Sequence, residues 1–274
     1  MIAKYYLGKS VLITGGSSGI GLALAKALAG YGAKITLLAR DAQKLEAGKA
    51  AILQQYPHTQ VETISADVTD ADTLSELLEN HVRVHGTPDI LINSAGVARP
   101  GYVEEIPLDV FRWTMDIDYH GTVNTIKLLL PGMLDRGTGH IINVSSLAGV
   151  LGVYGYTAYS GAKFAVKGFS DTLRAELKPR GITVSVIFPP DTDTPQLSWE
   201  NQFKPKETSS ISGNAKPISA DFVARETLKA ASRGKYAIVP GLEAKLTYFA
   251  ATRLGNWVYP IIDLLVRKAI KNNK

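Results

Sequence analysis

The chain has 274 residues, of which 45% are hydrophobic and 20% are charged. This composition excludes global disorder, and the length suits one large α/β domain or two small ones. The chain has no cysteine, which excludes disulfides and metal sites built on thiolates. The net charge of +5 is spread along most of the chain. Because nucleic-acid binding usually needs a clustered basic face, we predict no nucleic-acid partner. We also predict no metal site.

Strands and helices are predicted to alternate along the chain. Short apolar runs predict seven strands, at about 11–13, 34–39, 61–65, 89–93, 139–144, 183–188 and 237–239. Helical periodicity predicts helices at about 22–29, 42–55, 72–85, 108–136 and 157–178. Continuous apolar strands that alternate with helices indicate a parallel sheet covered on both faces. We therefore predict a single doubly wound Rossmann domain over residues 1–274, with a seven-stranded parallel sheet.

A glycine-rich loop, Thr14-Gly-Gly-Ser-Ser-Gly-Ile-Gly21, follows the first predicted strand and leads into a helix. Glycines allow a backbone to turn tightly and to approach a pyrophosphate, which then meets the free N–H groups of the helix N-terminus. A structural turn explains such a loop nearly as well, but its place between strand and helix favours a dinucleotide site. The expected cofactor contacts in the loop are Gly15, Ser17, Ser18, Gly19, Ile20 and Gly21.

The end of the second predicted strand favours NADPH over NADH. NAD sites usually place a carboxylate there for the ribose hydroxyls, whereas this chain has Ala39 and Arg40. The planar guanidinium of Arg40 could pair with a 2′-phosphate. The alternative is a solvated arginine at a strand end. Together with the glycine loop, Arg40 predicts NADPH/NADP+ as the cofactor.

Tyr159 and Lys163 lie four residues apart in a predicted helix, which places them on one face. A free tyrosine has a pKa of about 10 and is a poor acid at neutral pH. A nearby positive charge lowers that pKa and turns the phenol into a usable general acid. Taken alone, the pair is more often an ordinary surface contact.

Several motifs together resemble the short-chain dehydrogenase/reductase family over nearly the whole chain. They are the glycine loop, Asp67-Val68, Asn93-Ser-Ala-Gly96, Asn143-Val-Ser-Ser146, Tyr159-Ser-Gly-Ala-Lys163, and Pro189-Pro190 followed by Thr194. The resemblance implies that Ser146 binds the substrate carbonyl, that Tyr159 donates the proton, and that Lys163 lowers the tyrosine pKa and holds the nicotinamide ribose. Ser145 is the alternative serine.

The same resemblance implies the remaining cofactor contacts and an assembly. The contacts are Asp67, Val68, Asn93, Ala95, Gly96, Tyr159, Lys163, Pro189 and Thr194, with Asp67 at the adenine. Members of this family often form homodimers or homotetramers through two long helices.

Asp118 stands where the family often has an asparagine. The family role uses mainly the backbone carbonyl, which orders a water that leads to the lysine, and an aspartate keeps that carbonyl. A buried carboxylate near Lys163 would alter the local electrostatics. We group Asp118 with the catalytic residues, although a structural role on the helix is equally compatible with the sequence.

The run Pro189-Pro-Asp-Thr-Asp-Thr-Pro195 and the segment 152–159 resemble the 3-ketodihydrosphingosine reductase branch of the family. This implies NADPH-dependent reduction of 3-ketosphinganine to sphinganine in sphingolipid biosynthesis. The substrate is a lipid ketone with an ammonium group beside the ketone. Asp191, Asp193 and Glu200 could attract the ammonium, and Leu197, Trp199 and Phe203 could meet the alkyl chain. Alternatively, the acidic residues are solvated and the apolar ones pack on the domain.

Residues at about 191–217 are expected to form a lid over the substrate. Two other functions compete with the leading one. The first is a reductase of another apolar ketone, such as a β-ketoacyl chain or a steroid. The second is a protein that senses NADP without chemistry, which has no need of Ser146, Tyr159 and Lys163.

The C-terminal segment, about 256–271, is apolar and amphipathic, with Trp257 and Tyr259 at its start and basic residues at its end. Pro260 and Asp263 interrupt it, so it is a poor transmembrane span. It suits an interfacial helix, and packing against a partner subunit or the core suits it slightly better. We expect a cytoplasmic protein whose C-terminal segment is a candidate for peripheral contact with the cytosolic face of a membrane, in a eukaryote the endoplasmic reticulum.

Overall fold

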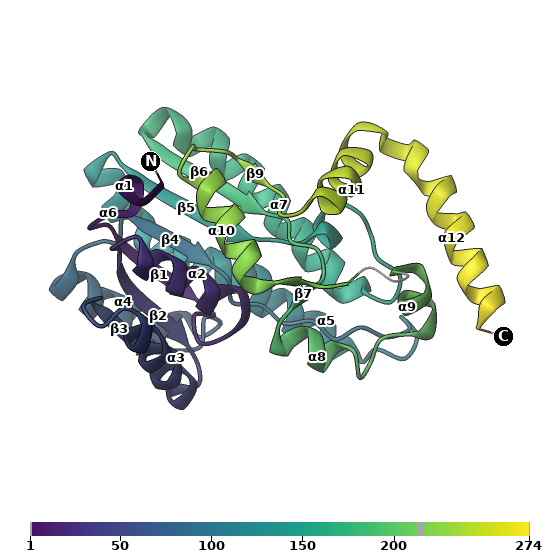
Figure 1. Cartoon of the computed structure of the whole chain (residues 1–274), viewed down its shortest axis with the longest axis horizontal. Coiled ribbons are helices and arrows are strands. Elements are labelled where there is room, and N and C mark those ends of the chain that lie inside the picture. The colour runs from purple at the N-terminus through teal and green to yellow at the C-terminus, as the bar shows by residue number, and fades with distance from the viewer. Residues whose placement is uncertain (1, 213–215, 274) are drawn as a thin grey trace.

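A computed structural model describes residues 2–212 and 216–273 of the chain (Figure 1). Within these ranges, seven parallel strands form one sheet in the order β3-β2-β1-β4-β5-β6-β9. The strands are β1 (Ser10–Thr14), β2 (Lys34–Ala39), β3 (Val61–Ser65), β4 (Ile90–Asn93), β5 (Gly139–Val144), β6 (Ile182–Ile187) and β9 (Ala237–Ile238). Each begins and ends within one residue of its predicted position, and the predicted fold class is confirmed.

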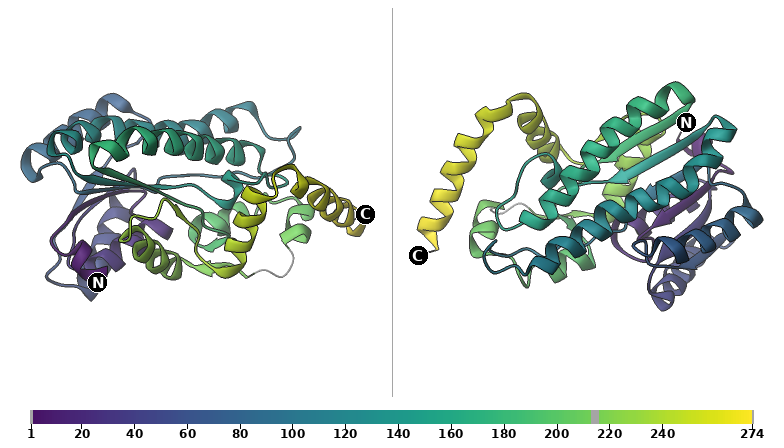
Figure 2. Two further views of the ribbon diagram at one scale, coloured as in Figure 1. Left: turned by 90° about the horizontal axis from the view of Figure 1, so that it is seen from above. Right: turned by 180° about the vertical axis from the view of Figure 1, so that it is seen from behind.

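Helices cover both faces of the sheet (Figure 2). One layer contains α2 (Gly19–Gly30), α3 (Ala42–Gln55) and α10 (Ala220–Ala231), and the other contains α4 (Ala71–His85), α6 (Gly121–Arg136) and α7 (Thr157–Leu177). Successive strand residues point to opposite faces, so Val11 and Ile13 pack against the first layer while Leu12 packs against the second. Because both faces of the central strands are buried, these strands form continuous apolar runs. The edge strand β3 differs, since its Glu62 and Ser65 are exposed.

The order of the strands reverses beside β1, which pairs with β2 on one side and β4 on the other. In open parallel sheets, ligands bind at such a switch point, outside the carboxyl ends of the strands. The glycine loop leaves β1 at this end and enters α2. The fold thus places the loop where a dinucleotide site is expected.

The long helix predicted at 108–136 consists of three parts. They are α5 (Leu108–Met115), a π-helical turn (Asp116–His120) and α6. A π turn opens the helix locally and is frequent at functional sites. This turn carries the buried Asp118, whose backbone carbonyl accepts a hydrogen bond of 2.8 Å from the Thr122 hydroxyl.

The segment predicted as a lid begins and ends at a small parallel pair of strands, β7 (Thr192–Asp193) and β8 (Ile218–Ser219). Between them lie α8 (Pro195–Glu200) and α9 (Lys206–Ser212). Residues 213–215 of the predicted lid lie outside the described residues. The pairing of β7 with β8 anchors both ends of the segment beside the carboxyl end of β6.

The chain ends in an arm made of α11 (Leu242–Arg253), a 3₁₀ turn (Gly255–Val258) and α12 (Tyr259–Asn272). Figure 1 shows α12 standing away from the sheet, with its C-terminal end toward α9. The arm exposes large apolar side chains, among them Trp257 (81% exposed) and Leu264 (68%), so packing against the core does not explain this segment. Among the described helices, none combines the length and apolar character needed to cross a membrane. The short helix α1 (Ile2–Tyr6) precedes β1.

Candidate active site

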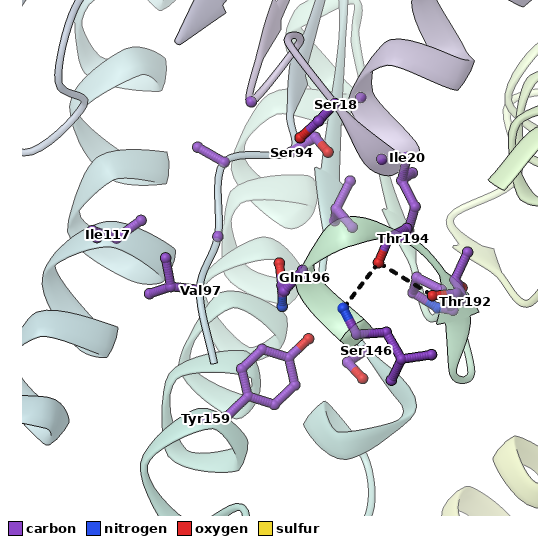
Figure 3. A pocket seen from close by; sticks show the side chains of 18 of the residues that line it. Ser18, Ile20, Ser94, Val97, Ile117, Ser146, Tyr159, Thr192, Thr194 and Gln196 are labelled. Carbon is purple, nitrogen blue, oxygen red and sulfur yellow. Dashed lines mark hydrogen bonds between the residues drawn. The ribbon is translucent and has the colours of Figure 1, made fainter. Parts of the chain in front are cut away.

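A cavity of about 510 Å³ opens at the carboxyl ends of the central strands (Figure 3). The glycine loop, the ends of β2 and β4, the N-terminal part of α7 and the lid segment all contribute to its walls. Every predicted cofactor and catalytic residue lines this cavity except Asn93 and Asp118. Residues from all six motifs, together with Arg40, therefore meet in one place.

Asn93 lies behind the cavity wall, in a buried hydrogen-bond network. Its side-chain nitrogen donates to the Asn143 side-chain oxygen at 2.9 Å, and its own oxygen accepts from the Thr125 hydroxyl at 2.6 Å. The network joins β4, β5 and α6. Asn93 thus holds the strand ends that carry the site, and its neighbour Ser94, which the motif did not single out, lines the cavity.

The glycine loop forms a cradle that admits no side chain. A Cβ atom on Gly21 would lie 2.3 Å from the Gly15 carbonyl oxygen, and one on Gly15, whose φ is +65°, would lie 2.7 Å from the Ser94 carbonyl oxygen. Ser18 caps α2 by position but makes no side-chain hydrogen bond within the described chain to the first turn of the helix. The N–H groups of that turn are therefore available to an anion, so the cradle fits the pyrophosphate of a dinucleotide.

Two basic side chains, one just after β2 and one in the first turn of α3, line this part of the cavity. The Arg40 guanidinium lies 3.7 Å from the Asp67 carboxylate, and the side chains of both are exposed to solvent. Lys44, in the first turn of α3, also lines the cavity. Sequence reasoning missed Lys44, although its position four residues after Arg40 was a usable signal. Together the two side chains could hold a 2′-phosphate.

Lys163 and Asp118 form a buried ion pair. The Lys163 Nζ lies 3.1 Å from Asp118 Oδ2 and donates to the Val144 carbonyl at 3.2 Å. Asp118 Oδ1 accepts the Val97 N–H at 2.7 Å. Burial raises the pKa of the Asp118 carboxyl, while the Lys163 charge and the Val97 N–H act in the opposite direction. The carboxylate at this position therefore contacts the lysine directly with its side chain.

The pKa of Tyr159 is raised well above its ordinary value, in contrast to the lowering that the Tyr159–Lys163 spacing predicts. Burial is the largest cause, and the negative charges of Asp118 and Glu200 add to it, while the Ser146 hydroxyl opposes it. The Lys163 ammonium lies 5.4 Å from the centre of the tyrosine ring. Asp118 is closer to that ammonium than the ring is, and it offsets the positive charge. The phenol therefore keeps its proton at neutral pH.

The two candidate serines differ in what they bind. The Ser145 hydroxyl donates to the Lys163 carbonyl at 2.9 Å and is buried. The Ser146 oxygen accepts the Ala148 N–H at 3.1 Å, which leaves its own proton to donate. In Figure 3, Ser146 and Tyr159 lie around the same part of the cavity. The geometry thus favours Ser146 as the ligand of a substrate carbonyl.

The lid segment supplies the far wall of the cavity. Of the predicted substrate residues, Asp191 and Leu197 line it, whereas Asp193 and Trp199 do not. Trp199 instead packs its ring against Phe203, with ring centres 4.9 Å apart.

Further polar residues also line the cavity, among them Tyr156, Gln196, Glu200 and Thr247. Among them, the sequence indicated only Glu200. Gln196 lies one helical turn before Glu200 on α8, which was a usable signal. Thr247 reaches the cavity from α11, and no local pattern in the sequence indicates this approach.

Comparison with known proteins agrees with this geometry. A sequence profile of the family described as short chain dehydrogenase matches residues 9–204. The chain belongs to this family. Its relatives include a 3-ketodihydrosphingosine reductase of Dictyostelium discoideum, 36% identical over 94% of this chain and 82% of that protein. They also include a 3-dehydrosphinganine reductase of Danio rerio, 39% identical over 84% of this chain and 70% of that protein.

Solved structures of short-chain dehydrogenases share the fold. A levodione reductase superposes with a TM-score of 0.80 at 27% identity and covers 87% of this chain and 99% of its own. An L-sorbose reductase from Gluconobacter frateurii, solved with NADPH and L-sorbose, gives a TM-score of 0.74 at 26% identity over 86% of this chain and 96% of its own. The predicted family is confirmed, and the protein is an oxidoreductase of the short-chain type.

Proposed function

We propose that this protein reduces 3-ketosphinganine to sphinganine with NADPH. The observation that carries the proposal is the single cavity that joins the glycine cradle to Tyr159, Ser146 and a lid with a buried carboxylate. The relatives named for this reaction, which align over most of the chain, support the choice of substrate. Reductases of other apolar ketones share the cradle and the tyrosine, so the lid distinguishes between them.

The proposed cofactor site follows from the charges and the cradle. NADPH, when bound, supplies the hydride to the carbonyl carbon. The glycine loop and the first turn of α2 would hold its pyrophosphate, and Arg40 and Lys44 would hold its 2′-phosphate. Asp67 would contact the adenine, and Lys163 would hold the nicotinamide ribose. The L-sorbose reductase structure with NADPH supports this choice of cofactor.

The chain's own residues perform the proton transfer in this proposal. The Ser146 hydroxyl donates a hydrogen bond to the ketone oxygen and orients the carbonyl. Tyr159, whose raised pKa keeps it protonated, gives its proton to that oxygen as negative charge develops on it. The Lys163 ammonium then stabilises the phenolate. Asp118 fixes the position of Lys163 through the ion pair of 3.1 Å.

The decisive test is the variant Tyr159→Phe, which removes one hydroxyl. NADPH oxidation would be followed with 3-ketosphinganine, a β-ketoacyl thioester and a steroid ketone. Turnover should fall by about 10²- to 10⁴-fold, the usual contribution of a general acid, while NADPH binding changes little. Tyr154→Phe, in the same segment but outside the cavity lining, is the control and should retain activity. Equal activity in Tyr159→Phe would refute the mechanism, and preference for another ketone would refute the substrate.

We further propose that the C-terminal arm lies on a lipid surface. Its exposed apolar side chains, such as Trp257, Leu264 and Leu246, accompany the basic residues Lys268 and Lys271. Apolar side chains beside cations suit the interface of an anionic membrane. Thr247 of the same arm lines the substrate cavity, which would place the membrane beside the entrance for a lipid ketone.

Vesicle flotation tests this arm. Full-length protein should float with phosphatidylserine-containing vesicles more than with purely zwitterionic ones, and the double variant Trp257→Glu/Leu264→Glu should lose flotation. Val84→Glu changes an equally exposed apolar residue on α4 and should not. If the double variant instead converts a dimer into monomers and vesicles recover neither protein, the arm is an interface between copies. The predicted homodimer or homotetramer, formed through the two long helices, remains to be tested by analytical sedimentation.

A further inference from the structure

Glu200 is a buried carboxylate in the wall of the substrate cavity. It lies on α8, and the residue is only 7% exposed. The Tyr156 hydroxyl donates to one of its oxygens at 2.8 Å, and the Gln196 side-chain nitrogen donates to the other at 2.8 Å. A carboxylate has about four acceptor positions, so two such bonds leave capacity for another donor. Two neutral donors thus orient the group without neutralising it.

No cation of the described lid pairs with this carboxylate. The ion pair formed there joins Lys204 to Asp191 at 3.3 Å. Burial raises the pKa of the Glu200 carboxyl, while the hydrogen bonds from Gln196 and Tyr156 and the charge of Lys204 act in the opposite direction. Burial of a carboxylate without a charged partner is unfavourable. A residue kept in this state inside a ligand cavity suggests that the ligand supplies the positive charge.

The carboxylate is also close to the reacting centre. The Tyr156 ring, whose hydroxyl holds Glu200, lies 5.8 Å from the Tyr159 ring, centre to centre. The negative charge of Glu200 also acts on Tyr159, because it contributes to the raised pKa of the phenol. A ketone held by Tyr159 and Ser146 would therefore lie in the same cavity as this carboxylate, with the Tyr156 ring between Glu200 and Tyr159.

We propose that Glu200 forms an ammonium-binding site and makes the enzyme select α-amino ketones. This inference rests on the proposed function, because 3-ketosphinganine carries its ammonium on the carbon next to the ketone. The two other acidic candidates fit less well. Asp191 is paired with Lys204 and half-exposed, and Asp193 is exposed and outside the cavity lining.

The test compares two ketones that differ by one group. The first is 3-ketosphinganine, and the second is the same hydroxy ketone without its amino group, both in the same detergent. Wild type should prefer the amino ketone in kcat/KM by about 10- to 100-fold, which corresponds to one hydrogen bond to a charged group. Glu200→Gln should reduce that preference to within about threefold. Glu207→Gln removes another lid carboxylate, which accepts from Tyr102 outside the cavity lining, and should keep the preference.

The outcomes separate the two proposals. If wild type reduces both ketones equally well, Glu200 does not select the ammonium. The wild-type measurement alone then refutes the ammonium site. If Glu200→Gln binds NADPH and melts like wild type but keeps the full preference, the ammonium site is refuted while the proposed reaction stands. If wild type reduces neither ketone but accepts a β-ketoacyl thioester or a steroid, the proposed function fails, and this inference fails with it.

Discussion

Replacing Asp118 by asparagine should weaken the fold and change the pH range of activity. The substitution keeps a side-chain oxygen for the Val97 N–H but removes the charge that lies 3.1 Å from the Lys163 Nζ. At an effective dielectric constant of about 20, two charges at that distance attract by about 5 kcal/mol. Removing one partner of a buried pair typically costs about 3–5 kcal/mol. For a domain of this size, that loss lowers Tm by about 10 °C.

The same variant should lose activity at a lower pH than wild type. Asp118 is one of the charges that raise the pKa of Tyr159, so its removal lets the phenol lose its proton earlier as the pH rises. Thermal unfolding and the alkaline limb of kcat/KM measure the two effects. Asp116→Asn, an exposed change in the same π turn, should alter stability by less than about 0.5 kcal/mol. If Asp118→Asn leaves both Tm and the alkaline limb at their wild-type values, the ion pair is not coupled to the tyrosine.

Three further changes test the cofactor site and the core. Arg40→Ala should raise KM for NADPH by about 10- to 100-fold and leave that for NADH nearly unchanged, because it removes a charge-assisted bond to phosphate. Gly21→Ala should weaken NADPH binding in a fluorescence titration, since its Cβ would meet a carbonyl oxygen at 2.3 Å, whereas Gly161→Ala has open space. Burial lowers the pKa of His140 from 6.5 to about 3, so its contribution to stability is complete above pH 6.5 and is lost as the pH falls toward 3. Denaturant unfolding should show about 2 kcal/mol lost between pH 6.5 and 5, and a His140→Asn variant should lack that loss.

The parts of the fold that depend on local pattern could be predicted. Strand β2 and helix α3 begin and end at their predicted residues. Burial on both faces makes β2 an apolar run, and Asp41 caps α3 by accepting the Lys44 N–H. The tight conformation of the glycine loop was also predictable, because it too depends on local sequence. Its glycines are required by contacts within a short stretch of chain and with the adjacent strand end.

The features that depend on three-dimensional burial could not be predicted from the sequence. The π turn at Asp116–His120 adds one residue to a helical turn, and a periodicity spread over the whole segment does not detect it. The direction of the Tyr159 pKa depends on burial and on Glu200, a residue 41 positions away in the sequence. The approach of Thr247 depends on the path of the C-terminal arm. Spacing identifies which groups meet, but their protonation follows from what surrounds them.

The charges around Tyr159 connect the unusual Asp118 to substrate choice. Two carboxylates, Asp118 and Glu200, both raise the pKa of the phenol, and Lys163 is the cation paired with the first. In the arrangement proposed above, an α-ammonium beside Glu200 would supply a positive charge to the second carboxylate. Because that ammonium would offset one of the charges that raise the pKa of Tyr159, it would make the proton easier to release toward the ketone. Recognition of the amine and proton donation are, in this arrangement, two effects of the same contact.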